Sequence, residues 1–447
     1  MSEAEARGPR ERGQVFRYVG FELSAEGVLT CTYDGDGTTF VERFDFAVGD
    51  DADFVSPAAQ AAGRLVFLLA GVSYYKTTAA PLIVGPADGL SAREQEFLHD
   101  FYIHGLAEFA YRPSGHDISD LRIEAPERTP APAAADVRRG PLVPFGGGID
   151  SIVVVADTVA AFDDCALFVA NTSDVLFEPI EDSAAITKLP ILRVRRHLDP
   201  KVLESAARGY FNGHVPVTGV LSAAAVLAAV AHGHDRVIMS NEHSASEPTA
   251  LRANGVLVNH QWSKSLDFER AFRDVLAESV TNVDYYSALR PYSELWVAQK
   301  FADLTEYHLA FRSCNKAFTV DANRRMATWC GRCDKCCFID LILAPYLSRE
   351  ELEAIFRGNE PLANPELDEV FRSLLGQPGT DKPLECVGDE GECRTAVTLA
   401  VTRPDRADNA LLAALAEHVR ELGKPVPSTE VLLAKQGPHF LPADDPR

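Results

Sequence analysis

Apolar and polar residues alternate between Phe16 and Phe46, and this period of two predicts β-strands with one buried face. Two Asp-Gly pairs interrupt the alternation, and such pairs are typical of tight hairpin turns. Two helical stretches are expected next, at about 57–71 and 91–110. The pattern therefore predicts an N-terminal α+β domain over residues 14–125.

The pattern changes after a segment rich in Pro and Ala, residues 126–141, which we interpret as a linker. Beyond it, short continuous apolar runs alternate with helical segments, as in a parallel sheet covered by helices in a doubly wound α/β domain. The longest helical segment is the Ala-rich stretch 217–232, which we expect in the core. We place the α/β domain at 142–346 and a mostly helical C-terminal region at 347–447. The apolar runs are 142–145, 166–170, 191–194 and 236–240.

Composition and charge narrow the class of protein. Of 447 residues, 46% are hydrophobic and 24% charged, as in ordinary globular proteins. The chain has no run of about 18 apolar residues, and its charged first residues do not resemble a secretory signal. We therefore expect a cytoplasmic protein without a membrane partner. A net charge of -22 disfavours a nucleic-acid partner, which needs a basic surface, and the oligomeric state is left open.

A glycine-rich segment, GGGIDS at 146–151, lies between an expected strand and an expected helix. Glycines expose backbone N–H groups, and the positive end of the helix points at the same place, so the segment predicts a phosphate site. Ser151 adds a hydroxyl donor, whereas the carboxylate of Asp150 is better suited to Mg²⁺. No Lys follows the last Gly, so this is not a Walker A loop. The phosphate cradle would be formed by Gly146, Gly147 and Gly148.

This segment resembles the Ser-Gly-Gly-x-Asp-Ser loop of PP-loop ATP pyrophosphatases, with Gly146 where that family has its first Ser. The resemblance implies a PP-loop parallel sheet and an enzyme that cleaves ATP between the α and β phosphates, often with transfer of AMP. Asn171, which follows an apolar run, would lie near the adenine. The missing Ser leaves open a degenerate domain that binds a nucleotide without turning it over.

Four of the nine cysteines fall within eight residues, in the segment Cys330-x-x-Cys333-x-x-Cys336-Cys337. In a reducing compartment such spacing indicates metal or redox chemistry, and Zn²⁺ prefers four ligands of this kind. We expect Cys314 as the fourth ligand beside Cys330, Cys333 and Cys336. An iron–sulfur cluster, or Cys337 in place of Cys336, is an alternative. The arrangement resembles the zinc knot at the end of some PP-loop domains, including 7-cyano-7-deazaguanine synthase.

Further segments resemble the bacterial cell-wall epimerases that act on UDP-N-acetyl-α-D-muramoyl-L-alanyl-L-glutamate. The resemblance implies that ATP and Mg²⁺ are used to invert the terminal L-Glu to D-Glu, with AMP and pyrophosphate as products. Adenylation of the carboxylate would make the α-proton easier to remove. Another PP-loop enzyme, such as a deazapurine synthase or an amide-forming ligase, is the alternative. The segments are LAGVSYYKTTAAP (69–81), HGLAEFAYR (104–112), NGHVPVTGVLSA (212–223), SNEHSASEP (240–248), NHQWSKSLDFE (259–269), RSCNK (312–316), WCGRCDKCCF (329–338) and ECVGDEGE (385–392).

Several polar residues are candidates for catalysis. Glu242 and His243 follow an apolar run, at the sheet edge where α/β proteins bind ligands, and are candidates for Mg²⁺ binding or proton transfer. Lys264, in a polar loop, could meet the nucleotide or a carboxylate, although a surface lysine fits equally well. Lys76 could reach a sugar phosphate, but a solvent-directed lysine is favoured. Acidic neighbours should raise the pKa of Cys386, so we expect a buried, unreactive thiol there.

Overall fold

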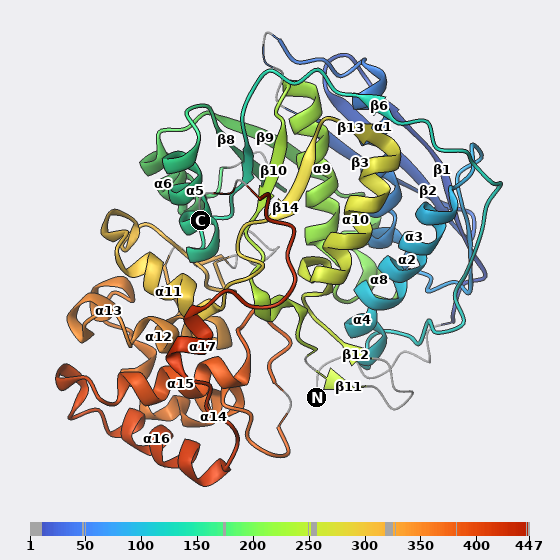
Figure 1. Ribbon diagram of the computed structural model, residues 1–447. Helices are drawn as coiled ribbons and strands as arrows, with labels where there is room; N and C mark the ends of the chain where they lie inside the picture. The colour runs from blue at the N-terminus through green and yellow to red at the C-terminus, as the bar shows by residue number, and fades with distance from the viewer. Residues whose placement is uncertain are drawn as a thin grey trace.

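A ten-stranded sheet forms the larger part of the protein, and helices near the C-terminus form a separate mass beside it (Figure 1). In sheet order the strands are β14-β10-β7-β8-β9-β3-β2-β1-β4-β5. Neighbouring strands are parallel from β14 to β9 and antiparallel from β9 to β1, and β4 and β5 continue in parallel to β1. This computed structural model describes residues 11–46, 49, 51–172, 176–248, 250–251, 257–317, 325–326, 328–380, 382–443 and 445.

The parallel half of the sheet has the strand arrangement that creates a ligand-binding crevice. β8 and β9, which follow β7 in the sequence, lie on one side of it, and β10 and β14 lie on the other, so the strand order reverses between β7 and β10. In open α/β sheets, ligands bind at the carboxyl ends of the strands at such a reversal. The strands are β7 (Leu142–Pro144), β8 (Ala166–Asn171), β9 (Ile191–His197), β10 (Arg236–Met239) and β14 (Asp284–Ser287).

The N-terminal strands extend this same sheet. β3 pairs antiparallel with β9, with Phe44 opposite Arg196, and the buried side chain of Arg196 forms an ion pair with Glu42. The expected hairpin is confirmed: Asp36 and Gly37 both have positive φ, at 49° and 83°, in the turn between β2 and β3. The strands of this half are β1 (Val15–Leu23), β2 (Val28–Gly35), β3 (Thr38–Phe46), β4 (Leu82–Val84) and β5 (Arg122–Glu124).

Helices cover both faces of the parallel strands. In β7, Leu142 belongs to the core that contains α1 and α9, whereas Val143 belongs to the core that contains α5 and α11. A strand buried on both faces must be apolar at every position, which explains the continuous apolar runs of the sequence. The Ala-rich α9 is buried along nearly its whole length, as predicted. The helices on the first face are α1 (Pro57–Ala70), α3 (Ala92–Gly105), α9 (Val217–His232) and α10 (Leu266–Ser279).

On the second face lie α5 (Ile149–Ala161), α6 (Glu178–Thr187), α11 (Glu294–Ala302) and α12 (Asp334–Leu343). The prediction of a mostly helical C-terminal region is confirmed by α13 (Arg349–Ile355), α14 (Asp368–Leu374), α15 (Glu390–Ala400), α16 (Ala410–Leu422) and α17 (Thr429–Leu433). Shorter elements complete the described chain: α2 (Val72–Tyr75), α4 (Ala107–Tyr111), α7 (Pro200–Leu203), α8 (Ser205–Arg208), β6 (Ala133–Ala134), β11 (Ala250–Leu251), β12 (Leu257–Val258) and β13 (Val280–Thr281).

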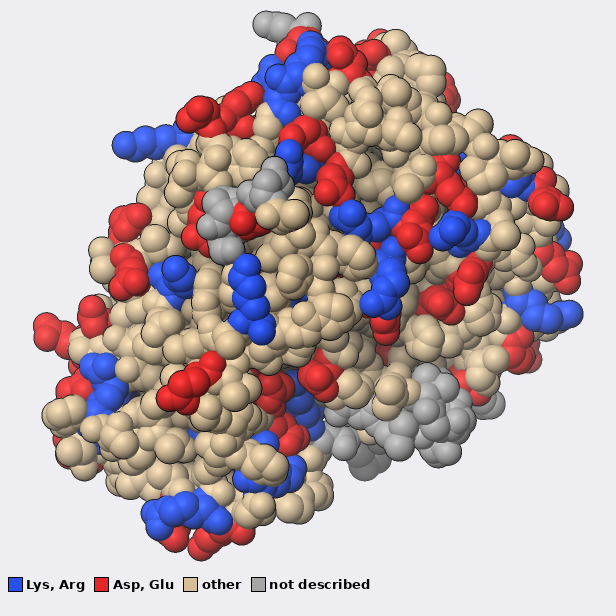
Figure 2. Space-filling view, in the orientation of Figure 1, with Lys and Arg blue, Asp and Glu red and all other residues tan. Residues whose placement is uncertain are grey.

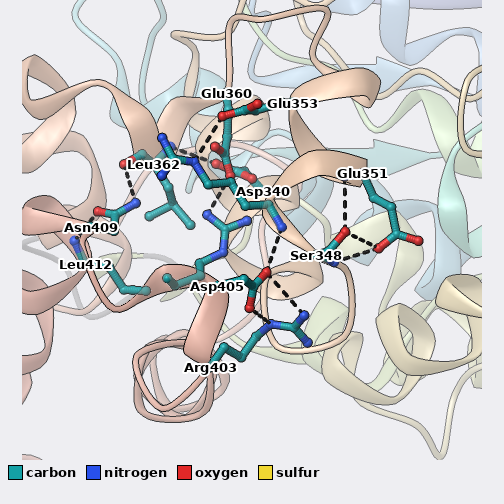
Figure 3. Close-up of polar contacts among 12 residues, drawn as sticks. Asp340, Ser348, Glu351, Glu353, Glu360, Leu362, Arg403, Asp405, Asn409 and Leu412 are labelled. Atoms are coloured by element: carbon teal, nitrogen blue, oxygen red, sulfur yellow. Dashed lines mark hydrogen bonds and ion pairs between the residues drawn. The ribbon is translucent and has the colours of Figure 1, made fainter.

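A buried polar cluster joins α12 to the helices that follow it (Figure 3). Asp340 accepts a hydrogen bond from the backbone N–H of Leu362 at 2.8 Å, and Asn409 donates to the carbonyl of Leu362 at 3.0 Å. The guanidinium of Arg406 pairs with Glu360 at 2.6 Å, and both side chains are almost fully buried. Burial and the neighbouring Glu360 hold the pKa of Asp340 well above its usual range.

Replacing Arg406 should therefore destabilise the C-terminal helices. Arg406→Ala leaves two buried carboxyl groups without their cation, and breaking a buried pair in this way costs about 3–5 kcal/mol of unfolding free energy. Because protonation neutralises both carboxyls, the loss should shrink as the pH falls. Urea denaturation at pH 7.5 and pH 5.5 measures both effects. The half-exposed Arg349, which pairs with Glu353 at 3.0 Å, is the matched control, and Arg349→Ala should cost less than about 1 kcal/mol. Equal losses for the two variants would contradict this account.

Candidate active site at the carboxyl ends of the parallel strands

The glycine loop connects β7 to α5 at the point where the strand order reverses. Gly147 has φ of +71°, a conformation that L side chains rarely adopt, and Gly148 is the N-cap of α5 without a side-chain cap. The first N–H groups of α5 thus point out of the helix toward the loop. Ser151 donates its hydroxyl to the carbonyl of Gly148 at 3.1 Å. A Cβ on Gly146 would meet no atom of the described residues within 4 Å, so the Ser of the related loops would fit here.

Three carboxylates from separate elements meet beside this loop. Asp150 lies in the first turn of α5, Glu242 follows β10, and Glu294 begins α11. One oxygen of each lies within 4.8 Å of the others. Oδ1 of Asp150 and Oε2 of Glu294 are buried and have no hydrogen-bond partner among the described residues. Burial and the charge of Glu242 raise the pKa of Asp150 to about 6, and burial and Asp150 raise the pKa of Glu294 well above its usual range.

Such a group of oxygens is costly without a cation, because like charges are held together away from water. Carboxylate oxygens are the ligands that Mg²⁺ prefers, and a magnesium site typically takes one or two of them together with phosphate oxygens and water. The three carboxylates, next to a loop that exposes N–H groups, could therefore hold a divalent cation.

Arg290 aligns two of the polar segments of the site. Its fully buried guanidinium pairs with Glu269 at 2.9 Å and donates to the carbonyls of Glu242, at 2.8 Å, and Lys264. The loop after β10 and the loop before α10 are thereby held side by side. Although burial alone would lower it, the pKa of Lys264 lies above its usual range, because Cys386, Glu242 and Asp150 surround its ammonium group. Lys264 thus belongs to the site and is not a surface lysine.

Cys386 reverses the expectation from the sequence. Its side chain is half-buried, and its Sγ accepts a hydrogen bond from Nζ of Lys264 at 3.3 Å. Burial opposes ionisation, but Lys264, His260 and Lys335 together lower the pKa of Cys386 to about 6. The acidic neighbours in the sequence were expected to raise this pKa. That expectation is wrong because cations from three other segments face the thiol.

His260 connects Cys386 to a second polar group. Its Nδ1 lies 2.5 Å from Oε2 of Glu108, and its ring lies 4.3 Å from that of His214. Burial by itself lowers the pKa of His260, but hydrogen bonding to Cys386 and Glu108 raises it to about 9. In contrast, burial and the neighbouring His260 lower the pKa of His214 to about 4. Two imidazoles whose pKa values are shifted in opposite directions therefore lie side by side.

The four expected cysteines form one cluster. The sulfurs of Cys314, Cys330, Cys333 and Cys336 all lie within 4.8 Å of one another, and Cys337 does not belong to the group. Sγ of Cys336 lies 3.7 Å from that of Cys330 and 3.4 Å from that of Cys333. A tetrahedral zinc with Zn–S bonds of about 2.3 Å separates its sulfurs by about 3.8 Å, so this donor set fits Zn²⁺.

The cysteine cluster also directs a lysine into the site. Lys335, between Cys333 and Cys336, donates to the carbonyl of Cys386, and its charge acts on Asp150. The segment that carries two of the four cysteines thus also places a cation near Cys386 and Asp150.

The remaining candidates lie around this centre. Asn171 ends β8, next to β7, and its buried Oδ1 has no partner within the described part of the chain. His243 follows Glu242, and the C-terminal segment passes it at Gly437. Lys76 is buried, donates to the carbonyl of Gly213 at 3.3 Å, and has its pKa lowered to about 8 by burial, so it is not directed into solvent. Sequence reasoning did not find Glu294, Glu108 or Arg290, because nothing in their local sequence marks them.

The face of the protein in Figure 2 carries both signs of charge. On the described part of the face in Figure 2, basic side chains are interspersed among acidic ones despite the negative net charge. A hollow of about 690 Å³ lies between α3 and α10 beside the site, and Asn259 and Trp262 on its wall flank His260 and Gln261. Among the described helices, none combines the length and the apolar character needed to cross a membrane.

Comparison with known proteins identifies relatives along nearly the whole chain. A family model described as the MurL N-terminal domain matches residues 8–288, and one described as the MurL C-terminal domain matches residues 310–430. The chain is 37% identical to the UDP-N-acetyl-alpha-D-muramoyl-L-alanyl-L-glutamate epimerase of Xanthomonas oryzae pv. oryzae over 438 residues, which cover 96% of this chain and 95% of that protein. It is 38% identical to the protein of the same name from Salinispora tropica over 383 residues, or 85% and 81% of the two chains.

Proposed function

Because this chain belongs to the family of UDP-N-acetyl-alpha-D-muramoyl-L-alanyl-L-glutamate epimerases, we propose that it inverts the terminal L-Glu of this nucleotide-linked dipeptide to D-Glu. The substrate is inferred from the names of relatives that match over 85–96% of the chain. The reaction belongs to peptidoglycan precursor synthesis. A cytoplasmic location is part of the proposal, because ATP and nucleotide-linked precursors are cytoplasmic solutes.

ATP would activate the glutamate by adenylation, with release of pyrophosphate. The observation that carries this step is the position of the 146–151 loop and of the Asp150, Glu242 and Glu294 carboxylates at the reversal point of the parallel strands. The N–H groups of the loop and the N-terminus of α5 suit the ATP phosphates, and Asn171, at the end of β8, would contact the base. A free carboxylate next to the α-carbon makes deprotonation very unfavourable, whereas a neutral acyl adenylate lowers that barrier.

Asp150, Glu242 and Glu294 would hold Mg²⁺, which neutralises phosphate charge when it is bound. Their two unpartnered buried oxygens fit this role. Lys264 and Lys335 would contribute positive charge beside them. His243 remains a candidate for proton transfer. We also assign Zn²⁺ to Cys314, Cys330, Cys333 and Cys336, in a closed structural site.

The decisive test combines stereochemistry with isotope exchange. The protein, incubated in deuterated water with ATP, Mg²⁺ and UDP-N-acetylmuramoyl-L-Ala-L-Glu, should yield D-Glu that carries deuterium at Cα, as measured by chiral analysis and mass spectrometry. The ATP analogue blocked between the α and β phosphates should support neither inversion nor exchange, because the unactivated carboxylate leaves the α-proton too weakly acidic. Inversion without ATP, or with the original α-hydrogen retained, would overturn the mechanism.

The same incubation separates the alternatives. A deazapurine synthase or an amide-forming ligase would release pyrophosphate only with its own substrate and leave the glutamate unchanged. A protein that binds the nucleotide without turnover would release none with any substrate. The chain's match to the epimerases along nearly its whole length favours the first proposal over both.

A further inference from the structure

The thiol of Cys386 lies between two positively charged side chains. Nζ of Lys264 is 3.3 Å from Sγ, and His260 is close enough to help lower the pKa of the same thiol. Both groups come from the loop between β12 and α10, more than a hundred residues before the cysteine. The half-buried side chain is not sealed in a core, unlike that of Cys393 one turn into α15. Such a place suits an ionised thiol that meets a ligand.

The backbone around Cys386 is fixed from several sides. Lys335 donates to the carbonyl of Cys386, and a Cβ on Gly388 would come within 3.3 Å of the Glu294 side chain, so the loop packs against the start of α11. Glu392, in the first turn of α15, accepts a hydrogen bond from the N–H of Leu295 at 3.1 Å. These contacts place the thiol next to the helix that carries one of the three carboxylates. Fixed positioning of this kind is what a proton-transfer group needs.

Lys264 links the thiol to the carboxylate group. Its pKa is affected by Cys386, Glu242 and Asp150, so all three lie around one ammonium group. If ATP and the glutamate carboxylate meet at Asp150, Lys264 is the side chain that connects that place with Cys386.

We propose that Cys386 is a catalytic residue that exchanges the α-proton on one face of the activated glutamate, with Lys264 and His260 as the positioning residues that keep the thiol ionised. The proposal rests on the epimerase function put forward above. It gives a role to a cysteine that the adenylation step does not use.

The proton and the electrons balance as follows. The Cys386 thiolate takes the α-proton of the L-glutamyl adenylate, and the C–H electron pair moves into the acyl group as an enolate. Water at the opposite face supplies the new proton and leaves hydroxide, which the Cys386 thiol proton neutralises through His260. Water then releases the carboxylate and AMP. No oxidant or reductant is required.

The charges around the thiol support this role. The cations that face it are Lys264 and His260 from the loop before α10 and Lys335 from α12, and the nearest anion of its own segment is Glu385. With a pKa of about 6, the thiol would be mostly ionised at neutral pH, where a general base is effective. Next to the thiol, Glu108, His214 and His260 have ligand atoms within 4.8 Å of one another. A metal bound by these three residues is therefore the alternative to a proton-transfer role for His260. Arg112, which pairs with Glu108 at 2.9 Å, and Lys76, whose charge acts on His214, disfavour a second cation there.

Cys386→Ser separates proton transfer from adenylation. A serine hydroxyl keeps the size of the side chain but is not ionised at neutral pH. In a single turnover with excess enzyme, the variant should release pyrophosphate in the same amount as the unaltered protein. Inversion and deuterium exchange at Cα should fall at least about 100-fold, the usual contribution of a positioned acid or base.

The matched control is Cys165→Ser, at the amino end of β8 and thus at the far end of the sheet from the site. This variant should change neither pyrophosphate release nor inversion by more than about twofold. Inversion that persists in Cys386→Ser, or pyrophosphate release that disappears together with inversion, would overturn the role of Cys386. An unaltered protein that releases no pyrophosphate would instead contradict the proposed function.

A second measurement tests the positioning residues without turnover. Iodoacetamide should alkylate Cys386 with a rate that rises through about pH 6, and Lys264→Met should move this midpoint upward by removing the cation at 3.3 Å. Peptide mass spectrometry distinguishes Cys386 from the other eight cysteines. A midpoint near that of an ordinary thiol in the unaltered protein, or one that Lys264→Met does not move, would refute the ionised thiol.

Discussion

Asp150→Asn should nearly abolish pyrophosphate release while the protein remains folded. Asn has the shape of Asp but loses the charge that a cation needs, so the carboxylate group would bind metal more weakly. Changes in the residues around metal ligands cost about 10–100-fold in affinity or activity, and loss of a ligand should cost at least about 100-fold. Steady-state release of pyrophosphate measures the activity, and Mn²⁺ titration followed by electron paramagnetic resonance measures the affinity.

Although Asp150→Asn should lower the activity, it should raise the stability of the metal-free protein. Asp150, Glu242 and Glu294 repel one another in the absence of a cation, and burial together with this closeness raises the pKa of Asp150 and Glu294. In metal-free protein at pH 8, Asp150→Asn should therefore raise Tm, as expected where function is maintained at the expense of stability. Asp163→Asn, on the exposed segment after α5, is the control and should change neither quantity. Unchanged pyrophosphate release by Asp150→Asn would contradict the assignment of Asp150 as a metal ligand.

Cys333→Ser should remove the metal and unfold the region around it. We expect about one zinc per chain in protein purified under reducing conditions, and the variant should contain almost none because Ser is a poor zinc ligand. Binding free energy at a structural zinc site contributes directly to folding. The loss should lower Tm and displace Lys335, which reaches Cys386 and influences Asp150. Epimerase activity should therefore disappear as well, although no cysteine of the cluster touches the substrate.

The adjacent cysteine is the control for this experiment. Cys337 is buried on α12 but lies outside the cluster, so Cys337→Ser should keep the zinc and most of the activity. Elemental analysis of both variants and of the unaltered protein gives the metal content. Absence of metal from the unaltered protein, or full metal content in Cys333→Ser, would contradict the assignment.

Features that depend on neighbours along the chain could be predicted from the sequence. The hairpin at Asp36 and Gly37 and the strand–loop–helix unit around Gly147 follow from backbone preferences that act over a few residues. The cysteine cluster was also predictable, because a Cys-x-x-Cys-x-x-Cys segment brings three sulfurs together by itself. Glu242 could be placed at the site because a residue that follows a parallel strand lies at the carboxyl edge of the sheet.

Only the tertiary structure decided which distant groups share one environment. Glu294 reaches Asp150 because α11 begins next to α5, and the pKa of Cys386 is lowered, against the effect of burial, because Lys264, His260 and Lys335 converge on it from other segments. Local sequence predicted the opposite for this thiol, since only its acidic neighbours were visible. The physical reason is that a charge interaction depends on distance in space and on burial, and both are set by packing. The sequence by itself thus determined the local elements and the cysteine spacing, whereas packing determined which distant side chains shift one another's pKa at the site.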